Sequence, residues 1–121
     1  MPHTAKWQHE QLTRHAAGEV KDMTDQVLAG TADPQAADAA RQLGRVTASI
    51  LADLEHRRPV AVTAADVREA AGDLGDCLPR SGVVTRPLLR AAAGELGDHL
   101  TWLQAISYVT AKAAAKRDQA A

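Results

Sequence analysis

The chain has 121 residues, of which 45% are apolar and 2% aromatic, and its 14 basic and 15 acidic side chains leave a formal net charge of −1. A charge this close to zero provides no field to hold a polyanion, which disfavours general binding to nucleic acid or to an anionic membrane surface. No stretch approaches the roughly 18 apolar residues that cross a bilayer, and the first ten residues lack the apolar segment of a signal peptide. The single cysteine, Cys77, has no partner for an intramolecular disulfide, which favours a reducing compartment. We therefore expect one cytoplasmic domain over residues 1–121 and no membrane association.

Alanine dominates the apolar residues, with 26 copies against 23 for Leu, Ile, Val and Phe together. A core rich in alanine gains less transfer free energy per residue than one built from Leu and Phe, so we expect low stability for an isolated monomer. The chain lacks Phe and Asn, and arginine outnumbers lysine ten to four. This bias is typical of a protein encoded by a GC-rich bacterial genome.

Helix-breaking residues gather at three places, around residues 29–33, 57–63 and 79–85, and strong helix formers fill the rest. Asp33 followed by Pro34 is a good helix start, and Thr63 with Asp66 three residues later resembles a capping box. The spacing predicts helices over residues 4–28, 34–57, 64–78 and 86–116.

Each predicted helix carries one apolar stripe at the helical period. The stripes are Leu12, Ala16, Val20, Met23 and Val27; Leu43, Val46, Ile50, Leu51 and Leu54; Val67, Ala71, Leu74 and Leu78; and Leu89, Ala92, Leu96, Leu100, Leu103 and Ile106. Four such helices joined by short loops predict an all-α, antiparallel (up-down-up-down) four-helix bundle.

Several large apolar residues do not fit these stripes. Trp7 and Tyr108 lie roughly opposite the stripes of their helices, while Trp102 and Val109 lie at a stripe edge. In the predicted topology the start of the first helix and the ends of the second and fourth meet at one pole.

The fourth helix is also too long for its neighbour. With about 31 residues against about 15 in the third helix, it extends some 24 Å further and leaves Ile106 and Val109 without cover. We expect a protein interface formed by Trp7, Trp102, Ile106, Tyr108 and Val109, with a second copy of the chain as the simplest partner. The alternative is internal cover by the first helix or by the 60–62 connection.

A ligand-binding bundle is the second possibility. Of the five histidines, His9 and His99 lie on or near apolar stripes, and with Trp102 they are candidates to line a pocket for a small molecule or metal. The topology places His9 near a pole and His99 near the middle of its helix, which separates them. No histidine pair has metal-ligand spacing, and His15 with Glu19, Asp22 and Gln26 forms a solvated face. We expect no metal or cofactor.

Catalytic and anion-binding patterns are weak. Neither Cys77 nor any serine has a recognisable base nearby, and no phosphate-binding or dinucleotide fingerprint is present, so we expect no enzymatic activity. Arg80, Arg86 and Arg90 surround the start of the fourth helix and could hold an anion, but glycine and arginine are ordinary in a polar loop, and the pattern favours a solvated loop.

Residues 62–72 (VTAADVREAAG) resemble the first helix and turn of helix-turn-helix regulators, which have a similar Thr cap, Asp-Val pair and Ala-Gly turn. This resemblance implies DNA binding by a regulator and covers 11 residues. The next eight residues are acidic and contain Pro79, where such regulators place a base-reading helix. The sequence therefore favours a non-enzymatic bundle that acts through protein contacts, as a homodimer or an accessory subunit.

Overall fold

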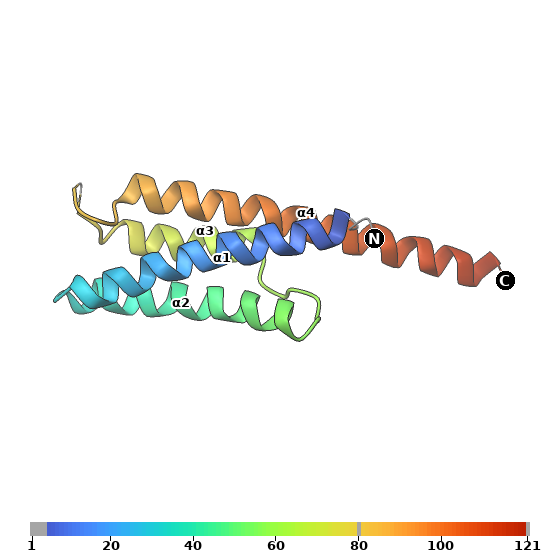
Figure 1. The fold of residues 1–121 in the computed structure, drawn as a ribbon, viewed down its shortest axis with the longest axis horizontal. Coiled ribbons are helices and arrows are strands. Elements are labelled where there is room, and N and C mark those ends of the chain that lie inside the picture. Colours follow the sequence, from blue (N-terminus) through green and yellow to red (C-terminus); the bar gives the residue numbers. More distant parts are fainter. Residues whose placement is uncertain (1–4, 80, 121) are drawn as a thin grey trace.

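The computed structural model of the chain describes residues 5–79 and 81–120, which form four helices (Figure 1): α1 (Ala5–Gly30), α2 (Pro34–Glu55), α3 (Ala64–Gly75) and α4 (Arg86–Ala120). Helix α1 packs against α2 and α4, and α3 packs against the same two helices. Successive helices run in opposite directions, which confirms the predicted all-α, antiparallel four-helix bundle. None of the helices in the described ranges has both the length and the apolar character needed to cross a membrane.

The two predicted helix starts are capped as the sequence indicates. The Asp33 side chain accepts a hydrogen bond from the Gln35 amide at 3.0 Å, with Pro34 in the first helical position. Thr63 Oγ1 accepts from the Asp66 amide at 3.2 Å, and Asp66 Oδ2 accepts from the Thr63 amide at 2.9 Å. These reciprocal bonds satisfy amides that the first helical turn leaves without partners, which fixes where α2 and α3 begin.

The helix ends differ from the prediction. Helix α3 ends at Gly75 rather than at residue 78, because the Cys77 and Leu78 amides bond three residues back in a tight turn. Helix α2 ends at Glu55. Arg57, just beyond it, adopts a positive φ of 54°, which is incompatible with a right-handed helix. Helices α1 and α4 run on to Gly30 and Ala120.

The core contains the predicted stripes except for Leu12 and for Ile106, which is only partly buried and is not among the side chains packed against the core. Leu12 is 47% exposed, whereas Thr13 beside it is buried, as are Thr24 and Thr47. The three hydroxyls donate to carbonyls of their own helices, Thr13 to His9 at 2.6 Å, Thr24 to Lys21 at 2.7 Å and Thr47 to Gly44 at 3.0 Å. Because each hydroxyl has a hydrogen-bond partner, threonine can occupy a position that the sequence pattern reserves for an apolar residue. The buried face of α1 therefore contains Thr13 and is rotated away from Leu12.

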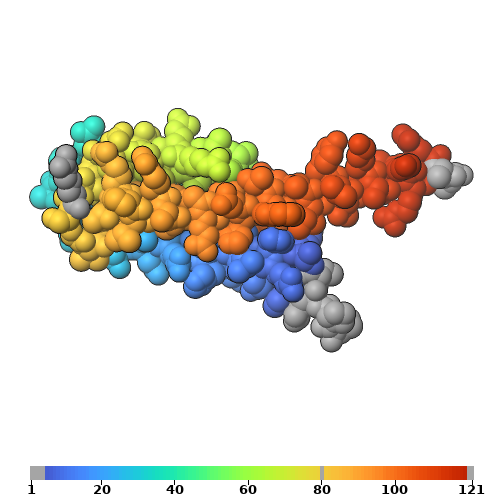
Figure 2. All heavy atoms as spheres, turned by 90° about the horizontal axis from the view of Figure 1, so that it is seen from above, coloured from blue at the N-terminus to red at the C-terminus, as the bar shows by residue number. Residues whose placement is uncertain are grey.

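Helix α4 extends beyond the bundle as a single helix (Figures 1 and 2). It has 35 residues against 12 in α3, a difference of about 34 Å at 1.5 Å per residue. Gln104 Nε2 donates to the Val62 carbonyl at 3.0 Å, so the α2–α3 connection covers α4 up to that level. Internal cover therefore stops near Gln104, and we call residues 105–120 the overhang.

The predicted pole needs a matching correction. The start of α1 and the end of α2 do lie at the same end of the bundle, but α4 runs past them, so its own end lies well outside the pole.

Candidate functional site

The first candidate surface is a row of apolar side chains that begins at the edge of the bundle and continues along the overhang. Trp102, Ile106, Val109 and Ala113 are spaced by four, three and four residues, which places them on one side of α4. Trp102 is 58% and Val109 63% exposed, Ala113 is exposed and Ile106 is partly buried. These four residues are called the α4 stripe.

Three of the five predicted interface residues belong to the α4 stripe, and two do not. Tyr108 is 66% exposed but lies on another side of α4, with Lys112 Nζ 6.0 Å from its ring centre. Trp7 is 42% exposed on α1, and it points away from the side of α1 that carries His9, since two residues turn a helix by about 200°. The structure therefore does not join all five into one patch.

His9 and His99 meet at the first residue of the α4 stripe. The His9 ring stacks on Trp102, with centroids 5.4 Å apart and planes 8° from parallel, and lies 6.3 Å from the His99 ring. The expectation that the topology separates the two histidines was wrong. The start of α1 lies beside α4 well before α4 ends (Figure 1), and the contacts of His9 with Trp102 and His99 fix its level along α4.

This ring cluster has the character of a packing contact. Its residues line neither the cavity between α3 and α4 described below nor the one beside Asp33 and Cys77, and the described residues contain no group of three His, Cys, Asp or Glu side chains able to hold a metal. His99 Nε2 lies 3.9 Å from Glu95 Oε1, and His9 Nδ1 is shielded from solvent with no hydrogen-bond partner in the described part of the chain. The cluster holds the start of α1 against α4.

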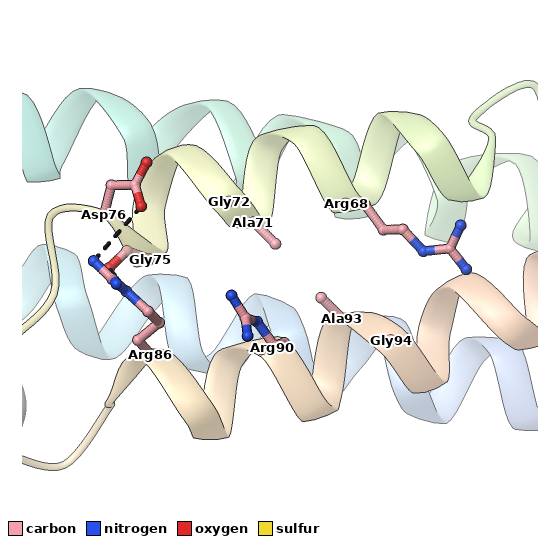
Figure 3. Close-up of a pocket in the computed structure, with 9 residues that line it drawn as sticks. All are labelled: Arg68, Ala71, Gly72, Gly75, Asp76, Arg86, Arg90, Ala93 and Gly94. Atoms are coloured by element: carbon pink, nitrogen blue, oxygen red, sulfur yellow. Dashed lines mark hydrogen bonds and ion pairs between the residues drawn. The ribbon is translucent and has the colours of Figure 1, made fainter.

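The second candidate surface is a groove between α3 and α4 with a cavity of about 310 Å³ (Figure 3), called the α3–α4 groove. Its lining residues are Arg68, Ala71, Gly72, Gly75, Asp76, Arg86, Arg90, Ala93 and Gly94. Two of the three arginines named as the weaker, anion-binding alternative, Arg86 and Arg90, line the groove, while Arg80 lies outside the described residues. Arg68 was missed, because only the pairing of α3 with α4 brings it to the same groove.

The partial helix-turn-helix motif does not form the geometry that reads DNA. Helix α3 is present, but residues 76–79 and 81–85 form turns and bends before α4 begins. A helix-turn-helix places its second helix after a turn of three or four residues.

No protein-family model, curated protein or solved structure matches the chain. Function is therefore inferred from the two surfaces themselves, the α4 stripe and the α3–α4 groove.

Proposed function

We propose that the protein is a non-enzymatic interaction module that forms a homodimer through the α4 stripe. The observation that carries this proposal is the regular row of exposed apolar side chains on a helix that projects alone from the bundle. The spacing of four, three and four residues is that of the seam between two packed helices. A single projecting helix of this length is marginally stable in water, so a partner along the seam would stabilise it.

The sizes of the stripe residues suit an antiparallel second copy. With Ile106 opposite the partner's Val109, Trp102 falls opposite the partner's Ala113, so the largest side chain meets the smallest. Such alternation lets two helices interdigitate without voids. The same pairing repeats on the other side of the two-fold axis, as a self-complementary dimer interface requires.

Charge favours the same arrangement. The overhang carries three basic side chains and one acidic one, whereas the rest of the chain carries 11 and 14. In a parallel pair Lys116, the next seam position after Ala113, would lie against its own copy. In the antiparallel pair it approaches the partner's Glu95 instead, which replaces repulsion with attraction.

Val109→Glu is the sharpest test of this dimer. Val109 is 63% exposed and is not part of the bundle core, whereas Trp102 also stacks on His9 within the chain. We expect sedimentation velocity to give a dimer for the wild type and a monomer for Val109→Glu, because the new carboxylates would be buried in the seam. Ala111→Glu is the matched control: it adds the same charge on the opposite side of α4 and should leave the dimer intact.

Disulfide cross-linking tests the direction of the pair. In a Cys77→Ala background, Ile106→Cys mixed with Val109→Cys should form a disulfide-linked heterodimer, and neither variant should cross-link efficiently alone. Efficient cross-linking of Ile106→Cys with itself would indicate a parallel pair and contradict the antiparallel register. A wild-type monomer at high micromolar concentration, or equal disruption by Ala111→Glu, would refute the dimer through the α4 stripe.

A further inference from the structure

The α3–α4 groove is hollow because glycines form part of its walls. A Cβ atom built on Gly72 or on Gly94 would find no other atom within 4 Å. Glycine inside a helix costs about 0.5–1 kcal/mol relative to alanine, and packing within the chain does not require it at either position. Between the two glycines, the methyl groups of Ala71 and Ala93 face into the groove and give it an apolar floor (Figure 3).

Two guanidinium groups from successive turns of α4 extend over one end of this floor (Figure 3). Arg86 donates from Nε to the Gly75 carbonyl at 3.0 Å, and its Nη2 is 3.6 Å from Asp76 Oδ1, beyond hydrogen-bond distance. Arg90 has no hydrogen bond or ion pair to any described residue. Like charges four residues apart destabilise a helix, so these neighbouring cations lower the stability of α4 unless an anion lies between them.

The chemistry of the groove matches a small organic anion. The lining contains three arginines and one aspartate, and the third arginine, Arg68, is held only by a 3.8 Å contact with Asp98. Guanidinium groups pair with phosphate through two parallel N–H···O bonds, and a dianion matches two of them better than a single carboxylate does. A cavity of about 310 Å³ is at the small end of ligand sites.

We propose that the α3–α4 groove binds a small organic phosphate, with the phosphate group held by Arg86 and Arg90 and the apolar body lying on Ala71 and Ala93. The groove lies on the α3 side of α4, and the α4 stripe contains none of its lining residues. Binding in the groove therefore does not depend on the proposed dimer.

Phenyl phosphate is a suitable probe because it combines a dianionic phosphate with a compact apolar ring. Isothermal titration of the full chain should show binding of phenyl phosphate that is stronger than that of inorganic phosphate or of phenol. Arg90→Gln should lower the affinity for phenyl phosphate at least tenfold, since charge-assisted hydrogen bonds are lost. Arg14→Gln, which removes an arginine that is also exposed but lies on α1, should change the affinity for phenyl phosphate less than twofold.

Gly94→Leu separates the apolar part of the site from the charged part. Its side chain would enter the open space of the groove and leave both arginines in place, so we expect loss of phenyl phosphate binding with inorganic phosphate unchanged. Thermal melts establish that each variant is folded. The proposal is overturned if wild-type protein does not bind phenyl phosphate, if Arg14→Gln weakens binding as much as Arg90→Gln, or if folded Gly94→Leu binds phenyl phosphate as tightly as the wild type.

Discussion

Replacing helix-interior glycines by alanine should stabilise this protein, against the usual direction of substitutions in a packed bundle. Gly18, Gly72 and Gly94 lie inside α1, α3 and α4, and a Cβ at any of them would meet no atom within 4 Å. The methyl group therefore creates no clash, and it removes conformational freedom from the unfolded chain. Each substitution should raise the free energy of unfolding by about 0.5–1 kcal/mol, and the three together by about 2 kcal/mol.

Urea denaturation followed by circular dichroism measures this gain directly. For a 121-residue chain the entropy of unfolding is about 0.25 kcal/mol/K near 60 °C, so each kcal/mol should raise the Tm by about 4 °C. Gly82→Ala is the opposite control, because its φ of 145° is a conformation that residues with a Cβ rarely adopt. That substitution should lower stability by about 1 kcal/mol or more.

A fall in stability for Gly18→Ala would refute the reasoning, since no neighbouring side chain lies within 4 Å of a Cβ at this position and Gly18 does not line the α3–α4 groove. Gly94→Ala has a second consequence, because its methyl group enters the α3–α4 groove. The Gly94→Ala variant should be more stable and at the same time bind phenyl phosphate more weakly. This is the trade-off expected when a destabilising residue is retained for binding. A gain in stability with unchanged binding would place the ligand outside the groove.

Three further substitutions test the core. Leu96→Ala should cost about 2–5 kcal/mol in urea denaturation because this side chain is fully buried, and a cost below 1 kcal/mol would mean that the helices close around the cavity. Thr47→Val should be neutral or slightly stabilising, because the carbonyl of Gly44 keeps its helical bond and a buried hydroxyl is removed. Thr101→Val is the control, since Thr101 is exposed and its hydroxyl also bonds to a carbonyl of its own helix. A Thr47→Val variant that is less stable than Thr101→Val would contradict the prediction. His9→Phe should preserve stacking on Trp102 and remove the unpartnered Nδ1, raising the Tm by a few degrees in a thermal melt, whereas a lower Tm would show that Nδ1 has a partner in solution.

The sequence predicted a helix start well where a single capping interaction determines it. Asp33 and Thr63 each satisfy specific backbone amides, and these bonds are fully determined by residues within three positions, so the sequence locates both helix starts. The buried face of α1 was less predictable. It depends on whether Leu12 or Thr13 points towards the other helices, and a threonine that bonds its own backbone competes with leucine in a way that hydropathy does not represent.

The candidate sites depend on how far each helix is shifted along its axis, which no local pattern encodes. The contact between His9 and His99 exists because the first turns of α1 lie beside α4 well before α4 ends. Likewise Arg68 joins Arg86 and Arg90 only because α3 lies against the first half of α4. The length of α4 was predictable because no proline follows Pro87 and the glycines after it are isolated, and the exposure of Val109 follows from that length.

Helix α4 carries both surfaces, on different sides of the helix. The core side of α4 contains Leu96 and Leu100, the α3–α4 groove contains Arg90 and Gly94, and the α4 stripe contains Val109. Because the groove and the stripe share no side chain and the intervening helix is held by the core, a change at one should not alter the other. We therefore expect Val109→Glu to abolish the dimer with phenyl phosphate binding unchanged, and Arg90→Gln to weaken phenyl phosphate with the dimer unchanged. If the double variant deviates from the sum of the single effects by more than about 0.5 kcal/mol, measured by titration and sedimentation, the two surfaces are coupled through α4, and the groove would then regulate assembly.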